Sequence, residues 1–319
     1  MPRTRFVPGR ASAFALVAVA ALLVWAGRAG AQTTTTTTAD PAAEAPAGED
    51  TLSDDTAATK GDGATTALRL RLENVTPQKI FFRGSHAATF EYEIAGRKAR
   101  DLVVEVVPKG GGEVVQRWQA KGVEPGSRQT QSWGGKTRSK DAARSGAYLF
   151  RVREKGGALA QRATSDGRHK AEGDRSFGYY DHIFPIRGKH TYGDGVGAPR
   201  DGHTHQGQDV FADCGTPLDA ARAGKVQFRG YQGSGAGHYV VIDGKKTGRD
   251  YVYMHLQGEA RAAEGDRVRT GERIGEVGES GNASGCHLHF ELWSPPGWYD
   301  GGDFLRSVTR QLKRWDGWS

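Results

Sequence analysis

The sequence is poor in cysteine and in long apolar runs. It contains only two cysteines, Cys214 and Cys286. If the protein is exported, such a pair predicts a disulfide, and two cysteines allow only one pairing. After residue 26 no stretch is apolar enough to cross a membrane. Residues 32–66 hold hardly a large apolar side chain, which excludes a packed core in that part of the chain.

The first 31 residues have the pattern of a secretory signal peptide. Arginines at 3, 5 and 10 precede an almost unbroken apolar run over residues 11–26. Ala29-Gly30-Ala31 then fits the small-x-small cleavage pattern, so we expect cleavage after Ala31. A membrane anchor is the rival interpretation, but a spanning helix needs about 20 apolar residues. The chain is therefore expected to be secreted, into the cell wall or the periplasm, with no transmembrane segment after signal removal.

The charge is unevenly distributed along the chain. Without the four arginines of the signal, the formal net charge falls from +7 to +3. Residues 32–66 carry seven acids and one lysine, which leaves +9 for the rest of the chain. A basic body suits a polyanion such as an anionic wall polymer, and on charge alone it equally suits nucleic acid or anionic lipid.

Composition and periodicity divide the remainder into parts. Residues 32–66, with a run of six threonines, read as a disordered linker. Between residues 67 and 155, short stretches of alternating apolar and polar residues are separated by Gly, Pro and Ser clusters. They predict a β-sandwich, for which we expect a spacer or wall-binding role. Trp133-Gly134-Gly135, followed by the strand at 145–152, loosely resembles the end of immunoglobulin-like modules.

Residues 156–175 are polar and are interpreted as a linker, and residues 176–319 as a second domain. This second domain is rich in glycine and short strand candidates and holds eight of the ten histidines. Its last element, over 303–315, is predicted to be a helix with Asp303 at its N-terminus. The expected fold class is mostly β: an immunoglobulin-like N-terminal sandwich and a C-terminal antiparallel β domain with a short C-terminal helix.

Two histidine motifs in the second domain suggest a metal site. The first is His-Gln-Gly-Gln-Asp at 205–209, and the second is His-Leu-His-Phe-Glu at 287–291. On a strand, His287, His289 and Glu291 would share one face. Zinc accepts imidazole nitrogen and carboxylate oxygen, and a catalytic zinc has three protein ligands and keeps one position for water. One histidine and one aspartate from the first motif and one histidine from the second make up such a set.

The motifs resemble those of the lysostaphin/LytM-type zinc endopeptidases, which share the duplicated hybrid motif fold. The pattern His-x-Gly-x-Asp, Tyr-x-His-Leu, His-Leu-His-Phe-Glu occurs in order at 205–209, 253–256 and 287–291. Flanking segments at 214–226 and 264–275 also resemble the family's hairpins, so the likeness covers about residues 180–300. It implies a zinc metalloendopeptidase with one Zn²⁺ per chain. Its implied substrate is the peptide part of peptidoglycan, and nucleic acid is not an expected partner.

The resemblance also implies roles for individual residues. His205, Asp209 and His289 are the implied zinc ligands, and His255 and His287 the implied catalytic histidines, one of which would act as base. His203 lacks the spacing to Asp209 and is expected to line the groove or to support a ligand residue. Three other histidines are expected on the surface or in the groove: His182, His190 and His238. Glu291 is interpreted either as a partner of a ligand histidine or as a plain surface carboxylate.

The cysteines lie where the resemblance departs from the usual pattern. Cys286 precedes His287, where proline is more usual, and Cys214 follows Asp209 by five residues. A Cys214–Cys286 disulfide would tie together the two segments that supply the implied ligands. The competing interpretation is a thiol that binds zinc or acts as nucleophile.

Two other functions are compatible with the sequence. One is a non-catalytic relative that binds the cell wall and activates another hydrolase, although such proteins usually lose zinc ligands and none is missing here. The other is a wall- or glycan-binding scaffold in which the sandwich does the work. Zinc content separates both from the enzyme.

Overall fold

The computed structural model describes residues 67–162 and 175–319. The predicted signal peptide and the 32–66 linker lie outside these residues, as does most of the predicted 156–175 linker. Within the described part, no helix is long and apolar enough to cross a membrane.

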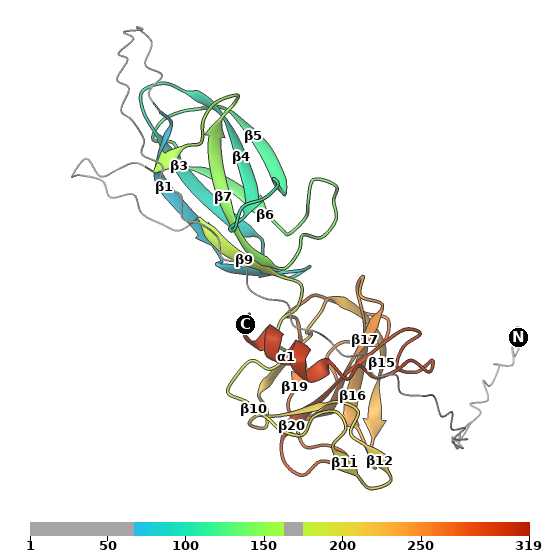
Figure 1. The fold of residues 1–319 in the computed structure, drawn as a ribbon. Helices are drawn as coiled ribbons and strands as arrows, with labels where there is room; N and C mark the ends of the chain where they lie inside the picture. The colour runs from blue at the N-terminus through green and yellow to red at the C-terminus, as the bar shows by residue number, and fades with distance from the viewer. Residues whose placement is uncertain (1–66, 163–174) are drawn as a thin grey trace, which may run out of the picture. The chain divides into compact units, whose positions relative to one another are not determined.

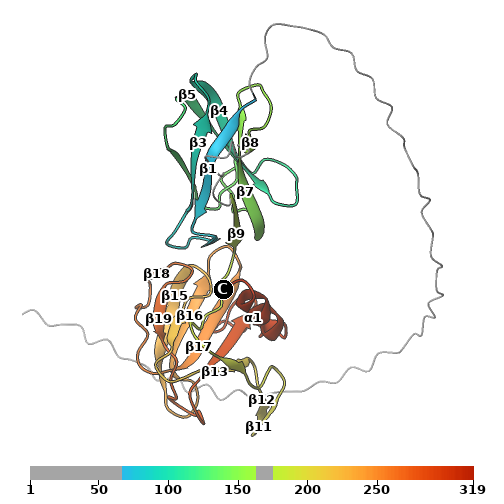
Figure 2. The ribbon, with the colours of Figure 1, turned by 90° about the vertical axis from the view of Figure 1, so that its left-hand side faces the viewer.

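The N-terminal part of the described chain is a sandwich of two sheets (Figure 1). One sheet has the order β6-β3-β1-β8, formed by Gln129–Trp133, Ala88–Ala95, Arg69–Thr76 and Gln161–Arg162. The other has the order β2-β9-β7-β4-β5, formed by Lys79–Phe81, Ser176–Tyr180, Gly146–Glu154, Arg100–Pro108 and Gln116–Val123. Figure 2 shows the two layers from the side.

Buried apolar side chains, which alternate with half-buried residues along the strands, pack the two sheets together. Phe90, Tyr92 and Ile94 of β3 are buried while the residues between them are half-buried, as period-two alternation requires. The ring of Phe90 stacks on Phe150 of β7, in the other sheet, with centroids 5.0 Å apart. The mostly β fold class and the N-terminal sandwich are thus confirmed.

The sandwich uses residues within the expected 156–175 linker and beyond it. β8 pairs in parallel with β1, and β9 pairs with β7 and β2. β9 spans Ser176–Tyr180, which the sequence assigned to the second domain. The division of the chain into domains stays a prediction, and these pairings favour a boundary after Tyr180 rather than after residue 175.

The second domain is built on an antiparallel sheet with the order β10-β13-β20-β17-β16-β15-β18. These strands span Thr191–Tyr192, Gln208–Phe211, His287–Trp293, Arg249–Leu256, Gly237–Gly244, Gly224–Gln232 and Arg267–Val268. One face of the central strands is packed in the core, where Val240, Tyr253 and Phe290 are fully buried. The opposite face of β20 carries His287 and His289.

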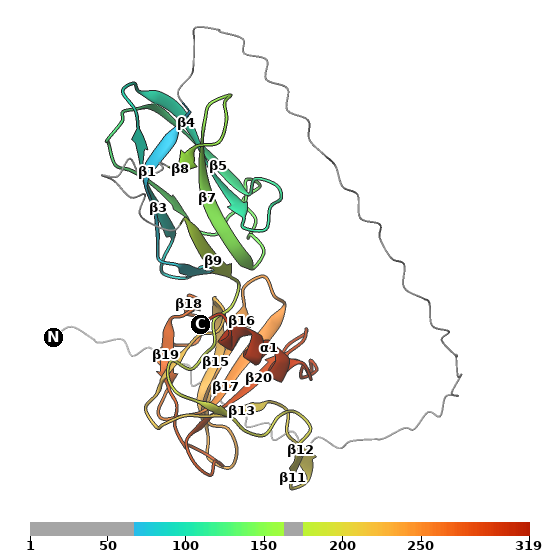
Figure 3. The ribbon, with the colours of Figure 1, turned by 60° about the vertical axis from the view of Figure 1, so that its left-hand side comes forward.

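Two small sheets complete the second domain. β14 (Pro217–Asp219) pairs with β19 (Arg273–Glu276), and β11 (Pro199–Arg200) pairs with β12 (His203–Thr204). The β11–β12 hairpin projects from the domain near β13 (Figure 3). It immediately precedes the His-x-Gly-x-Asp motif and brings Arg200 and His203 to the site described below.

The C-terminal helix is shorter than predicted. α1 spans Val308–Asp316, so the predicted start at Asp303 was wrong. The residues before it extend along β20 instead: Phe304 forms a bridge with Trp293, and the Leu305 N–H donates to the Leu292 carbonyl. Residues 304 and 305 therefore pair with the end of β20 and do not form the first turn of a helix. Val308, Leu312 and Trp315 form the buried face of α1, as its apolar spacing predicts.

Candidate metal and catalytic site

The candidate site begins with the pairing of β13 and β20. Their register sets Asp209 opposite His289 and Phe211 opposite His287. Because side chains alternate along a strand, His287, His289 and Glu291 share one face, while Leu288, Phe290 and Leu292 pack in the core. The sheet alone therefore brings together the two sequence motifs.

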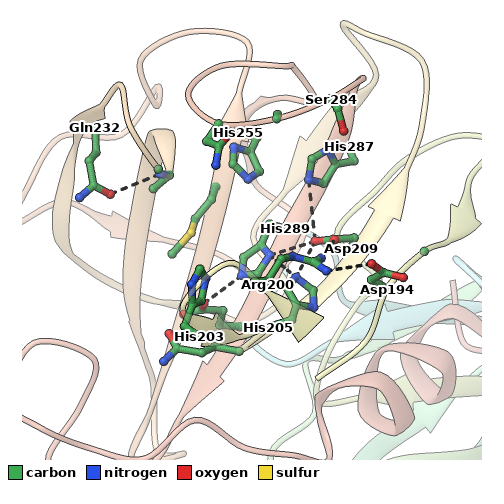
Figure 4. Close-up of a pocket in the computed structure, with 18 of the residues that line it drawn as sticks. Asp194, Arg200, His203, His205, Asp209, Gln232, His255, Ser284, His287 and His289 are labelled. Atoms are coloured by element: carbon green, nitrogen blue, oxygen red, sulfur yellow. Dashed lines mark hydrogen bonds and ion pairs between the residues drawn. The ribbon is translucent and has the colours of Figure 1, made fainter. Parts of the chain in front are cut away.

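His205, Asp209 and His289 converge on one point (Figure 4). Asp209 Oδ1 lies 3.0 Å from His205 Nε2 and 2.9 Å from His289 Nδ1. The two ring nitrogens are 2.8 Å apart. All three residues are buried, so the donor atoms form a compact, largely desolvated triangle.

The hydrogen bonds of the remaining nitrogens, His205 Nδ1 and His289 Nε2, explain why the two rings converge on Asp209. His205 Nδ1 is 2.9 Å from the Gly195 carbonyl, and His289 Nε2 is 2.9 Å from Glu291 Oε1. Carbonyl and carboxylate oxygens only accept, so these nitrogens carry the protons. Metal binding requires neutral rings, and in that state the lone pairs of His205 Nε2 and His289 Nδ1 point toward each other and toward Asp209. This donor set fits a divalent metal, because two imidazoles and one carboxylate are ligands that zinc accepts.

The ligand candidates are themselves held by further side chains. Glu291 Oε2 accepts the indole N–H of Trp293 at 2.6 Å, while its Oε1 accepts from His289. Glu291 is buried, so the surface-carboxylate interpretation was wrong. Arg200 donates to Asp209 Oδ2 at 3.1 Å and to Asp194 at 2.9 Å. Each oxygen of Asp209 therefore has its own partners.

The glycine of the first motif is required by close packing. A Cβ at Gly207 would lie 2.6 Å from the Phe290 carbonyl oxygen and 2.7 Å from His289 Nε2. The backbone between His205 and Asp209 can pass over β20 only without a side chain. This is a physical reason for glycine at the centre of His-x-Gly-x-Asp.

His255 and His287 lie beside the triangle, with ring centroids 4.7 Å apart. His255, near the end of β17, has φ +61°, an uncommon conformation for a residue other than glycine. Its Nδ1 is 2.8 Å from the Ser280 carbonyl, and His287 Nδ1 is 2.9 Å from the Gly285 carbonyl. His287 Nε2 is 3.8 Å from Asp209 Oδ1. In both rings Nδ1 donates to the backbone and Nε2 is left for the pocket.

The five residues line one open pocket of about 640 Å³. Its wall also includes Arg200 and His203 from the β11–β12 hairpin, Met254 and Phe211. Phe211 is 40 % exposed, and its ring lies 5.3 Å from that of His287. One pocket thus gives access both to the triangle and to the two additional histidines.

Burial and the mutual contacts set the protonation of the cluster. Although burial alone favours the neutral form of Asp209, the hydrogen bonds from His205 and His289 hold its pKa well below the usual range. Burial also lowers the pKa of His289, but hydrogen bonds to Asp209 and Glu291 outweigh it and raise the value to about 9. Burial lowers the pKa of His255 to about 4, so this ring is neutral at pH 7.

Cys214 and Cys286 are joined by a disulfide, with their Cα atoms 5.3 Å apart. Cys214 follows β13 and Cys286 immediately precedes His287. The bridge therefore links the two strands that carry Asp209 and His289, as the sequence predicts.

Sequence reasoning located the central residues and missed some of their neighbours. His203 lines the pocket as expected. The prediction for His182 was wrong: it is buried, stacked on Trp315 at 4.3 Å, with its Nε2 2.7 Å from the Tyr251 hydroxyl. Arg200, Asp194 and Trp293 were not singled out. Their only sequence signal is proximity to the motifs.

The fold and the site define a class: an antiparallel β domain with a His-Asp-His donor set and two further histidines in one pocket. The family follows from comparison, because residues 203–300 match the model of peptidase family M23. This part of the chain is thus similar to M23 peptidases, and the predicted resemblance to lysostaphin-type enzymes is confirmed.

Individual relatives match over the same part of the chain. An uncharacterized metalloprotease of Haemophilus influenzae is 42 % identical over 90 residues, 28 % of this chain and 18 % of the relative. The peptidoglycan DD-endopeptidase ShyC of Vibrio cholerae is 39 % identical over 90 residues, 28 % of this chain and 20 % of that protein. The matches thus span about a fifth of these curated relatives.

A solved structure also matches. The catalytic domain of lysostaphin from Staphylococcus simulans is 28 % identical to the aligned part, which covers 39 % of this chain and 92 % of that domain, with a TM-score of 0.35.

Proposed function

We propose that this chain is a secreted zinc endopeptidase that hydrolyses the stem peptides or peptide cross-links of bacterial peptidoglycan. The observation that supports it most strongly is the triangle of His205 Nε2, Asp209 Oδ1 and His289 Nδ1, with separations of 2.8–3.0 Å. The relative ShyC, whose name gives it peptidoglycan as substrate, aligns with this part of the chain.

His205, Asp209 and His289 would hold one zinc ion per chain. A zinc with three protein ligands keeps one position for water and supplies a polarised carbonyl and a water that ionises near neutral pH. Glu291 and the Gly195 carbonyl hold the two ligand rings in the tautomers that expose a lone pair to the metal. Arg200 binds the second oxygen of Asp209, which fixes the carboxylate plane.

His255 and His287 would handle the protons. With Nδ1–H donated to a backbone carbonyl, each neutral ring can accept a proton at Nε2, on the side facing the pocket. A ring that has taken the proton of the attacking water then carries an Nε2–H. That N–H can donate to the tetrahedral oxyanion or to the leaving amine. Two histidines side by side can thus serve both steps of peptide hydrolysis.

Export is supported by the sequence of residues 1–31, and a wall partner by the basic remainder of the chain. The peptide would be recognised in the pocket, and anionic wall polymers would be attracted by the net charge of +9 outside residues 1–66. Protein recovered outside the cytoplasm should begin at Gln32. Recovery of a chain that begins at Met1 would contradict export by signal cleavage.

The direct test uses isolated peptidoglycan. Purified zinc-loaded protein should release muropeptides, and mass spectrometry of the products should identify one class of cleaved peptide bond. Activity should disappear with a chelator and return with added zinc. Intact wall after prolonged incubation with the zinc-loaded chain would contradict the proposed function and favour a binding protein.

A further inference from the structure

One short loop contacts both proposed catalytic histidines. It spans residues 279–286, between the bridge at Gly278 and the start of β20 at His287. The Ser280 carbonyl accepts the Nδ1–H of His255 at 2.8 Å, and the Gly285 carbonyl accepts the Nδ1–H of His287 at 2.9 Å. Figure 4 shows Ser284 of this loop beside His287. The shape of the loop therefore sets the tautomer of both rings.

The Ser280 end of the loop is held by contacts with the neighbouring loop and strand. Ser280 Oγ donates to the Leu256 carbonyl at 2.6 Å and accepts the His238 N–H at 2.9 Å. A Cβ at Gly281, which has φ +77°, would lie 2.2 Å from the Gly237 nitrogen, so the two backbones touch. This end of the loop is held by the Ser280 hydroxyl and by close backbone packing.

The Gly285 end is held by the side chain of a different residue, Glu279. Glu279 Oε1 accepts the Gly285 N–H at 2.6 Å, which closes the loop on itself six residues later. Gly285 has φ +106°, a conformation for which glycine is suited. The carboxylate of Glu279 therefore fixes the residue whose carbonyl binds His287.

Packing does not explain why residue 279 is an acid. Glu279 is exposed, and its carboxylate lies within 4.8 Å of the sulfurs of Cys214 and Cys286. Such a group of two cysteines and one acid resembles a metal site. Both sulfurs are in the disulfide, however, so neither is a thiolate that could bind a metal. Among the described residues, the hydrogen bond that Glu279 makes is the one from the Gly285 N–H.

We propose that Glu279 is a positioning residue for catalysis: its carboxylate holds Gly285 so that the Gly285 carbonyl keeps His287 in the Nδ1–H tautomer, with Nε2 toward the pocket. This inference rests on the proposed function, because it takes His287 to act on the substrate. The Cys214–Cys286 disulfide anchors the next residue of the chain, and the carboxylate sets the orientation of the peptide before it.

The test compares Glu279→Ala with Glu279→Gln in the zinc-loaded full chain. Gln keeps an oxygen acceptor for the Gly285 N–H, and Ala removes it. We expect Glu279→Ala to lower kcat on a wall peptide about three- to tenfold, the effect of one hydrogen bond, with unchanged KM and zinc content. Glu279→Gln should remain within about twofold of the wild type.

A second readout reports the tautomer itself. The ¹⁵N shifts of the His287 ring, assigned by their absence in His287→Ala, should show the Nδ1–H form in the wild type and Glu279→Gln. In Glu279→Ala they should move toward the Nε2–H form. Glu259→Ala is the matched control, because Glu259 is also exposed and paired, to Arg229 at 3.1 Å, but does not line the pocket.

Three results would overturn the inference: wild-type kcat and ring shifts in Glu279→Ala, equal losses in the Ala and Gln variants, or loss of zinc from Glu279→Ala. Failure of the proposed function is a separate result. If the wild-type chain cleaved no wall peptide, that function would fall, and the ring shifts would still decide whether Glu279 controls the His287 tautomer.

Discussion

The two folded regions each bury an acid on a β-sheet, and they satisfy it in different ways. In the sandwich, Glu105 of β4 is fully buried and accepts hydrogen bonds from Arg117, Arg151 and Arg153 at 2.8–3.3 Å. In the second domain, Asp209 Oδ1 of β13 lies 3.0 Å from His205 Nε2 and 2.9 Å from His289 Nδ1, and Arg200 donates to its other oxygen.

The difference separates an acid that stabilises the fold, Glu105, from an acid that can bind a metal, Asp209. Guanidinium groups stay protonated and only donate, so the Glu105 cluster neutralises charge and offers no lone pair to a ligand. Imidazoles change protonation near neutral pH and, when neutral, bind metals. The Asp209 cluster also lines an open pocket. Burial and a shifted pKa therefore occur in both regions, and the partner residues indicate which region carries chemistry.

The largest effect is expected when the Asp209 cluster loses a ligand. His205→Ala, Asp209→Ala and His289→Ala should each lose the single zinc ion and with it all measurable peptidase activity, because two remaining protein ligands bind zinc weakly. Metal analysis of the purified, folded variants measures this. Retention of one zinc per chain in all three variants would show that the ligand assignment is wrong.

The disulfide should contribute the next largest effect. Cys214 and Cys286 are 72 residues apart, and in the chain-entropy model closing such a loop contributes about 4 kcal/mol to the free energy of unfolding. The double variant Cys214→Ala/Cys286→Ala should be less stable by that order in denaturant titration. Thiol titration of the unfolded, unreduced wild type should find no free sulfhydryl, and two free thiols would contradict the bond.

A smaller effect is expected at the partner of His289. Glu291→Gln keeps the shape of the side chain but removes the charge that accepts the His289 N–H. Partners of ligand histidines typically change metal affinity 10- to 100-fold, so zinc should bind more weakly by about that factor. Competition with a chromogenic chelator measures the affinity. Wild-type affinity in Glu291→Gln would mean that the carboxylate does not tune the site.

The smallest effect is expected in the sandwich. Glu105→Gln should lower the free energy of unfolding by about 1–2 kcal/mol, a reduced value because the three arginines are partly exposed. Zinc content and peptidase activity should not change. An activity loss in this variant would contradict the division between a structural and a chemical cluster.

The same variant gives a pH prediction. Burial tends to raise the pKa of Glu105, but the hydrogen bond and charge of Arg151, with Arg117 and Arg153, lower it below the usual value. A carboxyl with a depressed folded pKa stabilises the fold above its unfolded pKa, about 4.3, and loses that contribution as pH falls. The stability difference between wild type and Glu105→Gln should therefore shrink from pH 7 to pH 3. A difference that grows would have the wrong sign.

The sequence predicts the parts of the site that follow from strand geometry. His287, His289 and Glu291 alternate with apolar residues, so one strand places them on a common face. The spacing of His205, Gly207 and Asp209 predicts the rest of the triangle through the family pattern. These features are local, and the antiparallel pairing of two strands is enough to assemble them.

Other features depend on tertiary contacts that leave no local pattern. Arg200 reaches Asp209 because the β11–β12 hairpin turns toward the site. His182 is buried because Trp315 and Tyr251, distant in sequence, stack on it and bind it. The predicted helix start at Asp303 was wrong because residues 303–305 form hydrogen bonds with the end of β20 and the residue after it. Each error reflects long-range packing overriding a local preference.

The most direct test of the central claim compares two histidines on one strand face, His287 and His289. Zinc content and cleavage rate should be measured on the same samples of His287→Ala, His289→Ala, His255→Ala and wild type. We predict that His289→Ala loses zinc, while His287→Ala and His255→Ala keep it and lose a factor of about 10² or more in rate. The double variant His255→Ala/His287→Ala should fall short of the product of the single losses, because the two rings act as a unit. Zinc loss from His287→Ala, or a wild-type rate in it, would contradict the separation of metal ligand from catalytic histidine.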